Sequence, residues 1–355
     1  MLMATRNKTP AQTRAETATH SDAGTSSRST SRATSDSGSD LRLLVRAATM
    51  YHLEGLTQAE IAARLGVSRP TAGRLVARAR AQGLVQVTVS APPHLSVSIH
   101  TDLERSVEQA FGLDEALVID EVADGTTSGN AALGRAGASV LARRIQSTDT
   151  FGFTWGPEQV AVADAMSASA SCQRVVQMDG SMTSVDYHTG VDHALARFSE
   201  RLHAQPLRLV APLYVDAETV TALNRDSILS QSLSAARGAH IMLFGVGSVS
   251  TSTTLFEGAY IDAIVLDELI ELGAVGEIGG RFYDAAGEPV SSSLVERTVS
   301  VPLDAVRACP TSILVSGGVH RRESILGALR GGFATILVTD TETAEWLVMQ
   351  EKGRQ

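Results

Sequence analysis

The sequence predicts an α/β protein with an N-terminal (winged) helix-turn-helix domain followed by a larger α/β effector domain. Between residues 41 and 83, apolar residues recur with the 3.6-residue period of helices, and a capped turn interrupts them. From residue 101 onward, short β-branched runs alternate with helical patterns. This alternation is typical of βα units around a mainly parallel sheet.

Length and composition are those of a globular protein. The 355 residues exceed one average domain, and 43% of them are apolar against 19% charged, so two folded domains and a tail are expected. No apolar run approaches the roughly 20 residues that cross a bilayer, which predicts a cytoplasmic protein without a membrane partner. Cys172 and Cys309 lie far apart, without His or Cys at ligand spacing. We therefore expect no disulfide, no metal site and no cofactor.

Composition divides the chain into four segments. Residues 1–39 are rich in Ser, Thr, Ala, Gly and Arg, and they predict a disordered tail because they cannot bury enough apolar surface. Residues 40–90 predict the helix-turn-helix domain, with an alternating run at 84–90 that would form the wing. A proline-containing linker is expected at 91–100, and the α/β domain at 101–350.

The positive charge is concentrated in the first domain. Residues 41–83 contain seven Arg and two Glu, a net charge of +5 in a chain of net charge −9, so the remainder carries −14. A basic segment on an acidic body is typical of a modular DNA-binding protein, although a solvated helix face would carry the same charges. The motif has to decide between these interpretations.

The motif lies at residues 57–83. Thr57 and Glu60 have the spacing of a capping box, in which each side chain binds the other residue's free backbone N–H at a helix start. Gly66 is expected to end this helix with positive φ, and Ser68 to cap the next helix, with Pro70 in its first turn. The predicted inner face comprises Ile61, Ala62, Leu65, Val67, Leu75, Val76 and Ala79.

The second helix would be the recognition helix of a DNA-binding domain. Its exposed N-terminal part is predicted to carry Ser68, Arg69, Thr71, Ala72 and Arg74 toward base edges in the major groove. Further along, Arg78 would meet phosphates, which adds affinity without sequence information. The same geometry occurs in a plain helical hairpin, but spacing, capping and charge together favour binding to operator DNA.

Six strands and three helices are predicted in the second domain. The strands are ALVID (116–120), TFGFTW (150–155), RVVQM (174–178), HIMLFGVG (240–247), SILVSGG (312–318) and TILVTD (335–340), and the helices 130–144, 157–168 and 322–330.

Six segments carry a family resemblance when their order and spacing are taken together: residues 67–87 in the first domain, and FGFTWG (151–156), APLYVD (211–216), MLFGVGS (242–248), GAVGEIGGRFYDAAGEPV (273–290) and the segment 316–348 in the second. They resemble the SorC family of sugar-responsive regulators, the sugar-binding branch of DeoR-like regulators, over nearly all of the chain from Leu41. The resemblance implies an effector domain similar in fold to ribose-5-phosphate isomerase and glucosamine-6-phosphate deaminase. Its site would lie at the C-terminal ends of strands, as in open sheets generally.

The first candidate wall of that site is the turn that carries Thr154, Trp155, Gly156 and Glu158. A strand, a glycine turn and a helix start offer backbone N–H groups to an anion. The family commonly has Thr or Arg-Thr after the glycine, suited to a sugar phosphate, whereas here Pro157 removes a donor and Glu158 adds negative charge. These changes favour an unphosphorylated sugar or polyol, unless Glu158 merely complements the helix dipole.

Further candidate residues follow two other strands. Gly245 and Gly247 permit close backbone approach, or mark only a tight turn. The resemblance places Arg321 where the family usually has a Lys facing the anionic group of the effector, and Glu277 near the sugar. Arg321 keeps the positive charge, so an anionic ligand stays possible. As alternatives, Arg321 is a solvated helix residue and Glu277 a surface acid.

A regulator is favoured over an enzyme such as a sugar-phosphate isomerase with an accessory DNA-binding domain. Lys8 and Lys352 are the two lysines of the chain, and neither lies where a Schiff base could form in the core. His188 and His193 lie near acidic residues, but their spacing fits no metal motif. A DNA architectural protein would not need a large acidic α/β domain. A homodimer or homotetramer is expected, because one helix-turn-helix reads a half-site.

Overall fold

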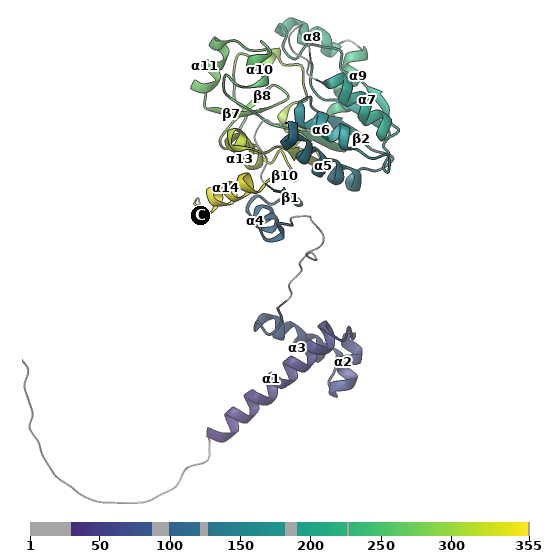
Figure 1. The fold of residues 1–355 in the computed structure, drawn as a ribbon, viewed down its shortest axis with the longest axis vertical. Helices are drawn as coiled ribbons and strands as arrows, with labels where there is room; N and C mark the ends of the chain where they lie inside the picture. The colour runs from purple at the N-terminus through teal and green to yellow at the C-terminus, as the bar shows by residue number, and fades with distance from the viewer. Residues whose placement is uncertain (1–29, 87–98, 121–126, 182–189, 226, 354–355) are drawn as a thin grey trace, which may run out of the picture. The chain divides into compact units, whose positions relative to one another are not determined.

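The computed structural model describes residues 30–86, 99–120, 127–181, 190–225 and 227–353 (Figure 1). The chain divides into two compact units, Met1–Ser90 and Ala91–Gln355. Each unit has its own hydrophobic core.

The N-terminal unit contains three helices, α1 (Thr30–His52), α2 (Gln58–Leu65) and α3 (Arg69–Ala81). α1 begins at Thr30, within the segment 1–39 that was predicted as a tail, and its residues that pack into the core begin at Leu43. The boundary of the tail stays a prediction. Residues 87–90 of the expected strand at 84–90 lie outside the described residues, so the wing stays a prediction.

The turn between α2 and α3 has the predicted caps. The Thr57 and Glu60 side chains form the capping box, and Gly66 ends α2 with a φ of 68°. Ser68 caps α3 by accepting a hydrogen bond from the backbone N–H of Thr71. The predicted inner residues are buried, apart from Leu65 and Val67, which pack against the core while partly exposed.

A seven-stranded parallel sheet forms the centre of the second unit, in the order β1-β10-β9-β5-β2-β3-β4. All six predicted strands are present, with ends that differ from the predicted ends by at most three residues, and sequence reasoning missed β4. The strands are β1 (Glu115–Ile119), β2 (Thr150–Phe153), β3 (Arg174–Gln177), β4 (Gln205–Leu207), β5 (Ile241–Phe244), β9 (Thr311–Val315) and β10 (Ile336–Asp340).

Helices cover both faces of this sheet. In β9, Ile313 and Val315 join one core and Leu314 the other, as the alternation of side chains in a strand requires. On one face lie α5 (Thr127–Arg144), α6 (Pro157–Ala165) and α7 (Val191–Arg201). On the other lie α4 (Thr101–Phe111), α9 (Ser227–Arg237), α12 (Leu303–Arg307), α13 (Arg322–Arg330) and α14 (Thr341–Lys352).

A glycine brings α5 close to α6. A Cβ at Gly134 would lie 2.5 Å from the carbonyl carbon of Ala161, a distance that real Cβ atoms do not reach. The absence of a side chain at position 134 therefore allows the backbone of α6, the helix that starts after Gly156, to approach α5 closely.

A second, antiparallel sheet was not predicted from the sequence. Its strands are β6 (Gly247–Ser248), β7 (Ala274–Ile278) and β8 (Arg281–Asp284), and a separate cluster of buried residues joins β7 and β8 to α10 (Thr254–Glu257) and α11 (Ala263–Glu271). These elements lie together at one side of the unit (Figure 1). The remaining elements are α8 (Ala217–Arg225) and η1 (Val295–Arg297), which contact each other, and η2 (Val319–Arg321), which contacts β6 and α13.

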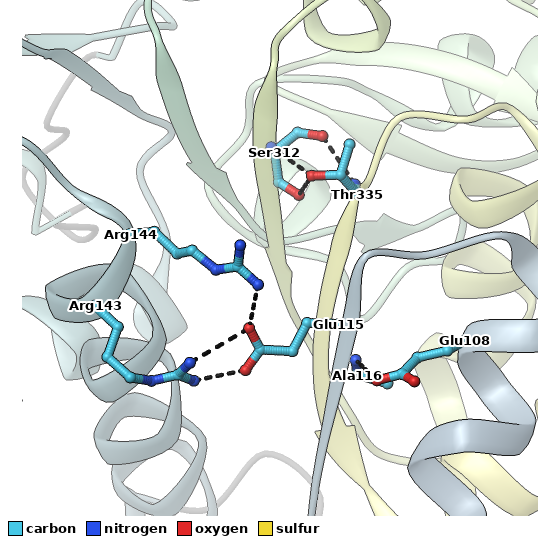
Figure 2. Close-up of polar contacts among 7 residues, drawn as sticks. All are labelled: Glu108, Glu115, Ala116, Arg143, Arg144, Ser312 and Thr335. Atoms are coloured by element: carbon cyan, nitrogen blue, oxygen red, sulfur yellow. Dashed lines mark hydrogen bonds and ion pairs between the residues drawn. The ribbon is translucent and has the colours of Figure 1, made fainter. Parts of the chain in front are cut away.

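Polar contacts hold the edge of the large sheet (Figure 2). Arg143 and Arg144, at the end of α5, both bind the carboxylate of Glu115 at the start of β1, over 2.5 and 2.6 Å. Burial opposes ionisation of Glu115, but these two arginine contacts outweigh it and lower its pKa. Ser312 and Thr335 exchange hydrogen bonds of 3.0 Å between backbone N–H and side-chain oxygen, which extends the ladder between β9 and β10.

Within the described residues, no helix combines the length and the apolar character needed to cross a membrane.

Candidate functional site

A cavity of about 100 Å³ opens at the carboxyl end of the parallel sheet. From β2 the sheet continues to β3 and β4 in one direction, while β5, β9 and β10 lie in the other. The direction therefore reverses between β2 and β5, and open α/β sheets bind ligands at such switch points. The turns after β2 and β5, the residue Asp179 after β3, the strand β7 and the end of η2 all contribute to the wall.

Glu158 and Arg321 form an ion pair in this wall. Nη1 of Arg321 lies 2.5 Å from Oε1 of Glu158, and the two side chains are 24% and 6% exposed. The contact has the distance of an ion pair, yet Oε1 has no partner with hydrogen-bond geometry. This oxygen can therefore still accept a hydrogen bond from a ligand hydroxyl, and Arg321 is already neutralised by the chain itself.

Two further carboxyl groups, Asp179 and Glu277, lie in the wall. Burial, followed by the nearby charge of Glu277, raises the pKa of Asp179 well above its usual value. Burial also raises the pKa of Glu277 to about 7, although hydrogen bonds from the backbone N–H groups of Gly280 and Gly247 oppose the shift. A carboxyl group that titrates in this range can either donate to or accept from a hydroxyl group. Neither carboxyl group would attract an anion.

The indole of Trp155 forms an ordered part of the wall. Its ring stacks on Tyr260 at a centroid distance of 5.6 Å, and its Nε1 donates to the carbonyl oxygen of Gly180 over 3.1 Å. The backbone N–H of Trp155 donates to Oδ1 of Asp179 over 3.3 Å. These contacts fix the turn after β2 in place.

Asp340 holds the turn that leads to Arg321. This buried residue ends β10, and its Oδ2 accepts a 2.7 Å hydrogen bond from the backbone N–H of Gly318. Thr343 donates to both carboxylate oxygens. A Cβ at Gly317 would lie 2.3 Å from Oδ2, so the turn needs a glycine there to approach the carboxylate. Asp340 is thus a positioning residue for the η2 segment.

All eight residues predicted to bind an effector line this one cavity: Thr154, Trp155, Gly156, Glu158, Gly245, Gly247, Glu277 and Arg321. Their role in binding stays a prediction. Sequence reasoning missed Gln159, Asp179, Ser248, Ser252 and Thr253, which also line it. Asp179 comes shortly after a predicted strand, so the rule that sites lie at carboxyl ends of strands could have found it. Gln159 carries no comparable signal.

The histidines considered in the sequence do not meet in this site. His193 binds Asp164 over 2.7 Å, and both side chains are 52% exposed, while His188 lies outside the described residues. Within the part of the chain that the structure describes, no three His, Cys, Asp or Glu side chains lie close enough to hold a metal ion.

The predicted DNA-binding residues lie on and beside α3. Ser68, Arg69, Arg74 and Arg78 are exposed and Thr71 is partly exposed. Ala72, predicted at the exposed surface, is fully buried. It lies on the same face of α3 as Leu75 and Val76, which pack into the core of this unit. Ser68 and Thr71 are joined by a 2.8 Å hydrogen bond between their hydroxyl groups.

Arg78 is engaged within the unit. Its Nη1 lies 2.9 Å from the carboxylate of Asp40 in α1, with both side chains about half exposed. Contact with a phosphate would therefore require Arg78 to exchange this surface ion pair, which contributes little stability, for the phosphate group.

Two family descriptions match the chain. Residues 96–349 match the "Putative sugar-binding domain" family, and residues 47–94 match the MarR family. The chain is similar to the deoxyribonucleoside regulator of Bacillus subtilis, with 31% identity over 86% of this chain and 97% of the relative. It is also similar to the sorbitol operon regulator of Klebsiella pneumoniae, with 28% identity over 88% of this chain and 99% of the relative.

Solved structures agree with this assignment. The full-length sorbitol operon regulator SorC from Klebsiella pneumoniae superimposes with a TM-score of 0.64 at 28% identity, covering 87% of this chain and 99% of that one. A sugar-binding regulator domain from Arthrobacter aurescens, at 24% identity, shares the fold of the larger unit with a TM-score of 0.65. The chain therefore belongs to the SorC family of transcriptional regulators with a sugar-binding domain.

Proposed function

We propose that this regulator binds operator DNA through α3 and that an unphosphorylated sugar or polyol in the cavity modulates this binding. The observation that carries the ligand class is the ion pair between Glu158 and Arg321. It neutralises, within the protein, the cation that the family resemblance assigns to an anionic group of the effector. A neutral, hydroxyl-rich ligand does not need that charge.

The remaining polar groups of the cavity favour the same ligand class. Arg321 is the one Arg or Lys among the described lining residues, whereas Glu158, Asp179 and Glu277 are all acids. A phosphate would bring about two negative charges close to the Glu158 carboxylate, and like charges repel in a site where burial weakens screening. Pro157 also removes one backbone donor from the helix start. Hydroxyl groups, in contrast, can donate to each of the carboxyl groups.

The DNA side of the proposal rests on Arg69 and Arg74. Both are exposed on the N-terminal half of α3, beyond the capped turn, where the recognition helix of this motif enters the major groove. Arg69 takes part in no ion pair or hydrogen bond among those described, and Arg74 makes one long contact of 3.4 Å to Thr71. Each guanidinium can therefore bind guanine O6 and N7 at little internal cost.

The protein is proposed to act in the cytoplasm as a homodimer or homotetramer. Operators of two-fold symmetry are read by two copies of one helix-turn-helix, and several SorC-type relatives are named as transcriptional regulators.

A combined binding experiment tests the proposal. The full-length protein is screened by thermal shift against D-sorbitol, D-mannitol, D-ribose and 2-deoxy-D-ribose and their phosphates, because a ligand of the folded state raises the melting temperature. Each compound that stabilises the protein is then added to a gel-shift titration with upstream DNA of its own gene. We expect a neutral compound to stabilise the protein and change operator affinity. Stabilisation by phosphates alone would overturn the ligand class.

An isomerase-like enzyme is the second candidate, because Glu277 has a pKa of about 7 and lines the cavity, as a general base would. Against it, the two lysines of the chain are Lys8 and Lys352, Lys352 lies at the C-terminal end of α14, and no lysine lines the cavity among the residues that the structure describes. We propose that the cavity binds its ligand without converting it. Incubation with pentose and hexose phosphates followed by NMR should show no product.

A further inference from the structure

Gln159 is a buried side chain of the cavity whose amide is not satisfied by the protein. It is the third residue of α6, lines the cavity and is 1% exposed. Its Nε2 has no hydrogen-bond partner among the described residues. Leaving a buried N–H without an acceptor destabilises a folded protein, so such groups are rare and demand a physical explanation.

The turns after β2 and β5 leave room for this amide. A Cβ at Gly156 would lie 2.5 Å from Oε1 of Gln159, and a Cβ at Gly245 would lie 3.2 Å from Nε2. Gly245 directly follows β5 and Gly156 comes three residues after the end of the neighbouring strand β2, and the amide lies close to both glycines at the switch point of the sheet. A side chain at either glycine would displace the amide from the place where a ligand of this fold is held.

A second buried glutamine, Gln177, differs in its donor, which is satisfied, whereas its Oε1 has no hydrogen-bond partner among the described residues. Gln177, at the end of β3, is 0% exposed, and its Nε2 donates to the carbonyl oxygen of Asp179 over 2.5 Å and to Oγ of Ser181 over 3.2 Å. The Nε2 of Gln159, in contrast, makes no such contact. Its donor is therefore available to a molecule in the cavity.

We propose that Gln159 determines specificity by binding hydroxyl groups of the effector, with Nε2 donating and Oε1 accepting. This inference rests on the proposed function. It adds the residue that distinguishes a ligand with a hydroxyl group at one position from the deoxy ligand that lacks this hydroxyl group. A hydroxyl group of a molecule in the cavity can accept from Nε2 of Gln159, which has no acceptor of its own. A deoxy carbon at that position would leave this buried donor unpaired, which sites of this kind reject strongly.

The first test needs no ligand. Gln159→Met keeps the length of the side chain and removes the unpaired amide, whereas Gln177→Met, the matched control, removes an amide with two bonded acceptors. We expect Gln159→Met to raise the melting temperature of the ligand-free protein by about 2–4 °C and Gln177→Met to lower it. A fall for Gln159→Met comparable to that of Gln177→Met would assign Gln159 a structural role and overturn the proposal.

The second test measures specificity by calorimetry with D-ribose, 2-deoxy-D-ribose, D-sorbitol and D-mannitol. We expect the unmodified protein to prefer the fully hydroxylated compounds, and Gln159→Met to bind them at least tenfold more weakly while losing most of the preference over 2-deoxy-D-ribose. Unchanged affinity and preference in Gln159→Met would refute the proposal. If the unmodified protein binds none of the four, the proposed ligand class fails, and the melting temperatures still decide whether Gln159 is structural.

Discussion

Replacement of Glu158 by Gln changes the charge of the cavity without changing the size of the side chain. In the unmodified protein the Glu158 carboxylate lies 2.5 Å from Arg321, so a phosphate drawn to Arg321 would come close to that carboxylate. Two like charges about 4 Å apart repel by about 4 kcal/mol at an effective dielectric constant near 20. This corresponds to about a thousandfold in affinity, of which solvent around the partly exposed arginine removes a share.

Glu158→Gln should therefore bind sugar phosphates about 10- to 100-fold more tightly than the unmodified protein does. The affinity for the corresponding neutral sugar should change less, because Gln can still accept a hydrogen bond from a hydroxyl group. Isothermal titration calorimetry with ribose 5-phosphate and ribose, at low and high salt, measures both effects, and the gain for the phosphate should shrink as salt screens the charge. Equal phosphate affinity in both proteins would refute the electrostatic reasoning.

Four further predictions concern other parts of the molecule. Arg69→Ala and Arg74→Ala should each weaken operator binding by about 1–3 kcal/mol in a gel-shift titration, and unchanged affinity would place the recognition surface elsewhere. Gly134→Ala should lower the free energy of unfolding by about 1–3 kcal/mol in urea titrations, because its Cβ meets the backbone of α6. Burial raises the pKa of Glu277 to about 7 in the folded protein, whereas the unfolded chain loses this proton near pH 4.5. The contribution of Glu277 to stability therefore falls as the pH rises from about 4.5 to 7. Glu277→Gln should raise the melting temperature more at pH 8 than at pH 5. Light scattering should find a dimer or tetramer, and a monomer at micromolar concentration, with and without DNA, would contradict this expectation.

Local signals predicted the elements that depend on local chemistry. The capping box of Thr57 and Glu60, the positive φ of Gly66 and the cap by Ser68 are each written in a few neighbouring residues, and all are present. Buried strands such as β9 and β10 are continuous β-branched and apolar runs, which mark a parallel sheet covered on both faces. Their ends shifted because turn residues continue the same composition.

Elements that depend on distant partners were not predictable in this way. The strand β4 has three residues with Pro206 at its centre, and it pairs only because it lies at the edge of the sheet. The second sheet pairs β6 with β7 across about 26 residues of chain, a contact that no local period reports. Ala72 was misplaced because a small residue reveals little about which face of a helix it occupies.

In the candidate site, too, sequence signals indicated single residues but not the contacts between residues that are distant in the chain. Strand, glycine turn and helix start indicated the turn at Gly156, and the family resemblance indicated Arg321 and Glu277. That Glu158 and Arg321 would neutralise each other could not be predicted, because the two residues are 163 positions apart and meet only when the sheet is assembled. The missing hydrogen-bond partner of Gln159 is likewise a property of the packed cavity.

The cavity is proposed to bind a neutral, hydroxyl-rich effector and not its phosphate. Calorimetric titration of the unmodified full-length protein compares the two directly when it uses matched pairs, D-ribose with ribose 5-phosphate and D-sorbitol with sorbitol 6-phosphate. The charges around Glu158 and Arg321 predict that the neutral member of at least one pair binds and that its phosphate binds more weakly. Tight binding of a phosphate together with no binding of its neutral counterpart would contradict the account.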